Sequence, residues 1–68
     1  MQFSVVIEKT ASNYSAYVPD LPGCVAAGVT VDETRAEIAA AIRFHIDGLS
    51  EDGLPIPAPQ TMVAEVEV

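Results

Sequence analysis

The side chains that could do acid–base, nucleophilic or metal chemistry are ten carboxylates, one cysteine and one histidine. Two-metal cleavage of a phosphodiester needs about three or four carboxylates gathered around ions roughly 4 Å apart. The acidic side chains are instead distributed over a predicted loop, the start and outer side of a predicted helix, and a predicted last strand; they include Asp20, Asp32, Glu33, Glu37, Asp47, Glu65 and Glu67. This pattern favours helix capping and a solvated surface. We therefore expect no catalytic residue and no enzyme.

The single cysteine and the single histidine also have structural interpretations. Cys24 cannot form a disulfide within the chain, and one cysteine with one histidine cannot make a zinc quartet. Cys24 follows a Pro-Gly turn at the start of a predicted strand, where a small apolar side chain is more often packed than reactive. His45 falls within the apolar stripe of the predicted helix. We expect both to be at least partly buried, and we expect no metal and no cofactor.

The most conspicuous local feature is a proline-rich corner, Pro19-Asp20-Leu21-Pro22-Gly23-Cys24. Each proline fixes its own φ, lacks an N–H and favours an extended residue before it, and the glycine permits a positive φ. The corner is either a rigid connection between two strands or a preorganised recognition loop, since a stiff loop loses less entropy on binding. Composition alone favours the connection.

Three short strands are predicted before the helix, at residues 3–8, 14–18 and 24–29, from their β-branched, aromatic and small residues. The residues 10–13 between the first two are typical of a hairpin loop. A fourth strand is predicted at residues 61–68, where apolar and acidic positions alternate after a stiff connector that holds Pro55, Pro57 and Pro59.

The helix is predicted from Thr30 to about residue 50–52. Thr30 and Glu33 have the spacing of a capping box, and Gly53 followed by Pro55 ends the helix. Its apolar stripe consists of Val31, Thr34, Ile38, Ala41, Ile42, His45 and Leu49. Phe44 projects from the other side, toward Glu37, Ala40 and Gly48, and is either a contact surface or an exposed aromatic without a role. The element order β-β-β-α-β predicts a two-layer α+β domain, an antiparallel sheet with one helix across it.

Composition limits the function classes. With 68 residues the chain makes one small domain, residues 1–68, which buries only about 60% of its unfolded surface. Because half of the residues are apolar, we expect a homodimer or higher oligomer to supply further burial. The net charge of −7 disfavours direct nucleic-acid binding and favours a basic protein partner. No membrane-length apolar run or signal-peptide pattern is present, so we expect a soluble, cytoplasmic protein.

Taken together, the motifs resemble the HicB-like antitoxin family over nearly the whole chain. The resemblance rests on the aromatic strand of Tyr14 and Tyr17, the corner at 19–24, a G-x-T pair formed by Gly28 and Thr30, an acidic Ala-rich helix beginning near Glu33, and the Pro-x-Pro run at 55–59. The structural motif residues are Pro19, Gly23, Cys24, Gly28, Thr30 and Glu33.

The resemblance implies a degenerate ribonuclease H-like fold without catalysis. It also implies a function: binding a small basic mRNA-cleaving toxin of the HicA type and covering its RNA-binding surface. Many family members continue into a DNA-binding segment, whereas this sequence ends at Val68, so we expect no C-terminal DNA-binding domain. The residues expected to bind the partner are Tyr17, Asp20, Leu21, Pro22 and Phe44. The alternative is an orphan oligomeric scaffold or small-ligand-binding module without a toxin.

Overall fold

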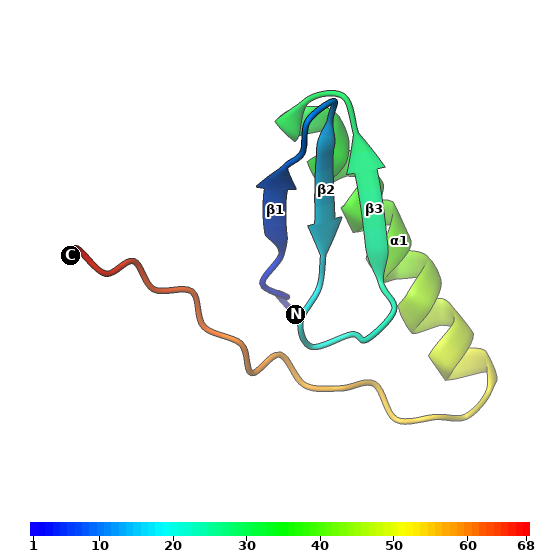
Figure 1. The fold of residues 1–68 in the computed structure, drawn as a ribbon. Helices are drawn as coiled ribbons and strands as arrows, with labels where there is room; N and C mark the ends of the chain where they lie inside the picture. The colour runs from blue at the N-terminus through cyan, green and yellow to red at the C-terminus, as the bar shows by residue number, and fades with distance from the viewer.

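The computed structural model describes residues 1–68 and shows a three-stranded sheet with one helix on one of its faces (Figure 1). The elements are β1 (Val6–Lys9), β2 (Tyr14–Tyr17), β3 (Val25–Gly28) and α1 (Val31–Glu51). The strands are antiparallel in the order β1-β2-β3. This arrangement confirms the predicted two-layer α+β class.

The hairpin between β1 and β2 closes through the turn predicted at residues 10–13. The Thr10 N–H donates to the Asn13 carbonyl at 2.8 Å, and the Asn13 N–H donates to the Thr10 hydroxyl at 3.0 Å. Side-chain bonds of this kind satisfy backbone groups that a tight turn leaves unpaired. The resulting register places Ile7 opposite Ala16, and Ala16 opposite Ala26.

The core lies between this row of the sheet and the helix. Ala16, Val18, Leu21, Cys24 and Ile38 are the buried apolar residues. Because Ala16 and Ala26 are small, the helix can approach the middle of the sheet closely. The helix packs mainly on β3 and β2 rather than on β1. One edge of the sheet is therefore less covered than the other.

The junction between β3 and α1 explains the G-x-T pair. A Cβ at Gly28 would lie 2.7 Å from the Thr34 hydroxyl oxygen and 2.8 Å from its backbone nitrogen, so only glycine fits without a shift. Thr34 is fully buried, and its hydroxyl donates to the Thr30 carbonyl at 2.7 Å. Thr30 caps the helix as predicted, because its hydroxyl accepts from the Glu33 N–H at 3.1 Å. The reciprocal bond from the Thr30 N–H to the Glu33 carboxylate does not form, so only half of the predicted capping box is present.

The fourth strand predicted at residues 61–68 was wrong. After α1 the chain runs extended past the lower end of the sheet and then leaves it, so that the C-terminus lies far from the strands (Figure 1). Alternation shows only that a segment suits a half-buried strand, and the hydrogen-bonding neighbour must come from elsewhere. In this chain no strand pairs with these residues. The first predicted strand is also shorter than expected and begins at Val6.

α1 is the single helix, and it is not long and apolar enough to cross a membrane.

Candidate partner-binding surfaces

The proline-rich corner is a rigid connection that belongs to the core. Three backbone hydrogen bonds of 3.0–3.2 Å close it. The Val18 N–H donates to the Cys24 carbonyl, the Leu21 N–H to the Val18 carbonyl, and the Cys24 N–H to the Leu21 carbonyl. Gly23 takes a φ of 85°, which side chains rarely adopt. Leu21 has no exposed surface at all, so we correct its expected role: it anchors the corner in the core and offers nothing to a partner.

Asp20 is engaged with the chain's own C-terminal part. One carboxylate oxygen accepts from the backbone N–H groups of Gln60 and Thr61 at 3.1 and 3.0 Å, and the other accepts from the Thr61 hydroxyl at 2.9 Å. The Thr61 N–H is the main cause that lowers the pKa of Asp20, although partial desolvation opposes it. These bonds show that Asp20 anchors the C-terminal part of the chain. Its predicted role as a partner contact stays a prediction.

The remaining partner-binding candidates at the corner face solvent. Tyr17 lies on the sheet face that α1 does not cover, in one register row with Val6 and Val25. Tyr17 and Val25 are 42% and 65% exposed. Pro22, in the corner, is exposed as well. The row is a small apolar patch centred on one aromatic side chain.

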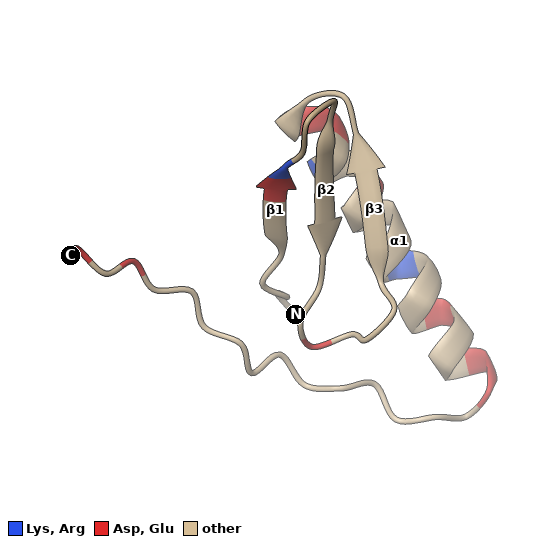
Figure 2. Cartoon of the chain, in the orientation of Figure 1, with Lys and Arg blue, Asp and Glu red and all other residues tan.

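Phe44 lies on the opposite side of the molecule, on the outward face of α1. At about 100° per residue, one stripe of the helix collects Glu33, Glu37, Phe44, Asp47 and Glu51. All five are exposed, and Phe44 is 82% exposed. We call this stripe the acidic face; Figure 2 shows acidic positions at both ends of α1 and in the C-terminal part. Tyr17 and Phe44 are therefore separated by both layers and cannot contact the same small patch on a partner.

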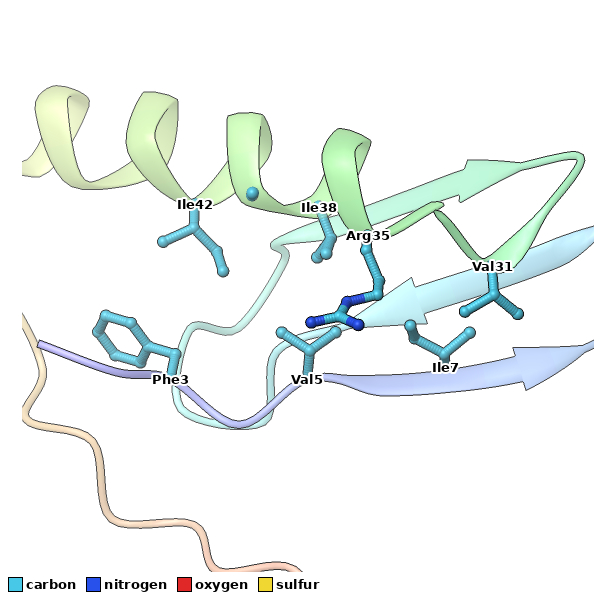
Figure 3. A pocket seen from close by; sticks show the side chains of 8 residues that line it. Phe3, Val5, Ile7, Val31, Arg35, Ile38 and Ile42 are labelled. Carbon is cyan, nitrogen blue, oxygen red and sulfur yellow. The ribbon is translucent and has the colours of Figure 1, made fainter. Parts of the chain in front are cut away.

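Sequence reasoning missed an apolar groove along the β1 edge. Figure 3 shows it between β1 and α1, with Phe3, Val5 and Ile7 pointing toward Ile38 and Ile42. The groove has a volume of about 590 Å³, and seven of its eight lining residues are hydrophobic. We call it the edge groove; its lining consists of Phe3, Val5, Ile7, Val31, Arg35, Ile38, Ala39 and Ile42. The sequence signal for this groove was that Phe3, Val5 and Ile7 are all apolar and lie on one side of the chain. Together they present more apolar surface than the helix covers.

Cys24 and His45, the two residues whose chemistry the sequence raised, both lie on the core side of the fold. Cys24 is buried in the core, and desolvation raises the pKa of its thiol, which keeps it protonated. His45 is half-buried on the core side of α1, as predicted. No group of three or more His, Cys, Asp or Glu side chains is arranged to hold a metal ion.

Both the sequence and the fold of the chain match those of known proteins. The family model described as HicB_like antitoxin of bacterial toxin-antitoxin system matches residues 3–67. The chain belongs to this family of antitoxins. Family membership supports a role in a toxin–antitoxin system through binding rather than catalysis, which agrees with the sequence-based expectation.

Individual relatives agree with this family. A solved structure titled HicA3 and HicB3 toxin-antitoxin complex contains a chain that is 32% identical, with a TM-score of 0.75 over 88% of this chain and 70% of that one. A UPF0150 protein of Helicobacter pylori is 33% identical over all of this chain and 96% of its own length. An uncharacterized 14.9 kDa protein of Haemophilus phage HP1 is 42% identical over 84% of this chain, but the match spans only 43% of the phage protein.

Proposed function

We propose that this chain is the binding component of a toxin–antitoxin pair, and that it neutralises a small basic mRNA-cleaving toxin of the HicA type by covering its RNA-binding surface. The observation that carries the proposal is the acidic face of α1, which presents an exposed phenylalanine among carboxylates. The similarity to a chain from a HicA3–HicB3 complex supports the same class of partner. We also propose that the chain acts as one unit over residues 1–68 and that it self-associates.

The acidic face suits a basic partner for two physical reasons. Carboxylates at Glu33, Glu37, Asp47 and Glu51 give a potential opposite to that of a surface that binds RNA phosphates, which raises the association rate and sets orientation. Phe44 supplies an aromatic anchor, the kind of side chain that dominates binding energy when a partner buries it. Exposed carboxylates alone add little affinity.

A surface that attracts phosphate must also attract carboxylates arranged at similar spacing. On α1 the acidic residues recur at helical intervals, so Glu33, Glu37 and Glu51 lie in a row rather than scattered. If the toxin bound this row of carboxylates, RNA could no longer reach the same positive surface of the toxin. Inhibition would then follow from occupancy and would need no chemistry by this chain.

The test is co-purification and titration with the product of a short basic reading frame adjacent to the gene. Phe44→Ala should weaken binding about 30-fold, the effect of removing an aromatic anchor. Because Phe44 is 82% exposed, its removal should leave the fold unchanged, which circular dichroism would check.

Tyr17→Ala is the matched control, an aromatic truncation on the opposite side of the molecule. We expect it to change toxin affinity by no more than about twofold. If Tyr17→Ala abolished binding and Phe44→Ala left it unchanged, the uncovered sheet face with Tyr17 and Pro22 would be the toxin surface. If the two proteins did not associate at all, the proposed function would be refuted.

A further inference from the structure

Residues 62–68, the C-terminal segment, alternate like a strand but pair with no strand of their own chain. Met62, Ala64, Val66 and Val68 share one side by alternation, and Glu65 and Glu67 lie on the other with Val63. The exposed fractions of Met62 and Val66 are 90% and 81%. An apolar row of this kind is unfavourable in water and requires a surface to cover it.

The edge groove is an apolar surface on which no other part of the chain packs. β1 is an edge strand, so half of its backbone N–H and C=O groups have no strand partner. Three side chains that point toward the helix are only half-buried: Ile7 of β1, and Phe3 and Val5 from the residues just before it. A second apolar hollow continues the groove along α1, lined by Met1, Phe3, Ala39, Ile42, Arg43 and Ile46. One added strand would satisfy the backbone groups and the apolar side chains together.

The segment and the edge have matching dimensions. Residues 62–68 comprise seven residues, as do residues 3–9, which are β1 and the three residues before it. At about 3.3 Å per residue each spans roughly 23 Å when extended.

Thr61 directs the segment away from its own sheet. Asp20 holds the Thr61 N–H and hydroxyl, and the Ser4 hydroxyl donates to the Thr61 carbonyl at 2.9 Å. These bonds fix the chain where it passes the end of β1, and beyond this point it diverges from the sheet (Figure 1). No residue of the segment lines its own groove.

We propose that the C-terminal segment of one chain adds as a fourth strand to the edge of β1 in a second copy, with its even-numbered side chains filling the edge groove, and that the exchange is reciprocal. The product is a two-fold symmetric dimer in which each copy completes the sheet of the other. The surface used is separate from the acidic face of α1, so the dimer does not rest on the proposed toxin binding.

The test uses the chain alone, with two substitutions of the same type three residues apart. Val66→Asp places a carboxylate on the side that enters the groove, and Val63→Asp places one on the outward side. In sedimentation equilibrium at tens of micromolar, wild type should have twice the 7.2 kDa mass of one chain. Val66→Asp should raise the dimer dissociation constant roughly 100-fold, and Val63→Asp by no more than about twofold.

A mixed sample of isotope-labelled and unlabelled wild-type chains shows whether the strand comes from the other copy. We expect intermolecular NOEs between methyl groups of residues 62–68 and those of Val5 or Ile42. Amide exchange along β1 should also become faster in Val66→Asp. A wild-type monomer would overturn the proposal. So would equal effects of the two substitutions, or NOEs confined to one chain.

Discussion

Asp20 illustrates how a residue in a recognisable motif acquires its role from distant contacts. Its carboxylate accepts three hydrogen bonds from residues 40 and 41 positions later in the chain. Sequence reasoning placed it on a rigid loop correctly, but it could not show that the oxygens were already occupied. The corner therefore serves as the attachment point of the C-terminal part.

The Asp20 anchor should depend on pH in a definite direction. The pKa of the folded-state carboxyl is lowered, chiefly by the Thr61 N–H, so its contribution to stability is fully present above about pH 4 and is lost as pH falls through the lower folded value. Amide chemical shifts of Gln60 and Thr61 should titrate together with Asp20 below about pH 4.

Asp20→Asn should abolish this titration and speed amide exchange at both residues, because a neutral amide oxygen is a weaker acceptor for their N–H groups than the charged carboxylate oxygen. Asp32→Asn, which replaces an exposed carboxylate in the first turn of α1, is the control and should preserve the titration. Unchanged exchange at Gln60 and Thr61 in Asp20→Asn would contradict the anchoring role.

At the scale of elements, the end of β3 lies close against the first turns of α1. Gly28 leaves no room for a side chain because Thr34 lies against it, and Thr34 is itself held by the Thr30 carbonyl. The helix packs mainly on β3 and β2, so β1 is thinly covered beside the edge groove.

Two glycine-to-alanine substitutions should have opposite effects on stability. Gly28→Ala should lower the free energy of unfolding by about 1–3 kcal/mol, because the new methyl group overlaps Thr34. Gly48→Ala, at a helical position with open space around it, should raise that free energy by about 0.5–1 kcal/mol. Urea unfolding of both variants measures the difference. Destabilisation by Gly48→Ala, or no change with Gly28→Ala, would contradict this packing.

Elements that form through contacts between residues close in sequence could be predicted, and an element that needs a distant partner could not. The helix and its Thr30 cap depend on neighbours within a few residues, so their pattern predicted them correctly. The hairpin turn at 10–13 was likewise local. Residues 61–68 have equally good alternation, but a strand exists only when another strand bonds to it, and nothing local supplies that neighbour.

The candidate site was harder to predict, for a related reason. Leu21 and Phe44 are both apolar, yet one is fully buried and the other almost fully exposed. Helical periodicity correctly placed Phe44 on the outside, because the helix itself was predicted correctly. Leu21 lies in a loop without periodicity, so its direction depended on the fold of the whole corner.

At the scale of the whole molecule, charge and apolar surface are divided between different sides. The acidic face lies on the outside of α1, the edge groove lies along β1, and the row with Tyr17 lies on the uncovered sheet face. The proposed dimer contact and the proposed toxin contact therefore use different sides of the chain. Two copies would present two acidic faces, which would give a divalent inhibitor.

Toxin binding should weaken as salt increases, because exposed carboxylates contribute through screened attraction. Between low and physiological ionic strength we expect the association rate constant to fall roughly tenfold, while the dissociation rate constant changes little. Glu37→Gln should reduce the salt dependence, and Glu8→Gln, outside the acidic face on β1, is the control. Surface plasmon resonance at several salt concentrations measures both rate constants. A salt-independent association rate would contradict a role for the acidic face.

The most direct test of the antitoxin role is an RNA-cleavage assay with the purified product of the adjacent basic reading frame. Both chains are added at the molar concentration of the toxin, chosen between the dissociation constants of the two complexes. Cleavage should fall sharply with wild-type chain and recover with Phe44→Ala. The chain alone should leave the RNA intact. Cleavage that continued at full rate in excess wild-type chain would contradict the account.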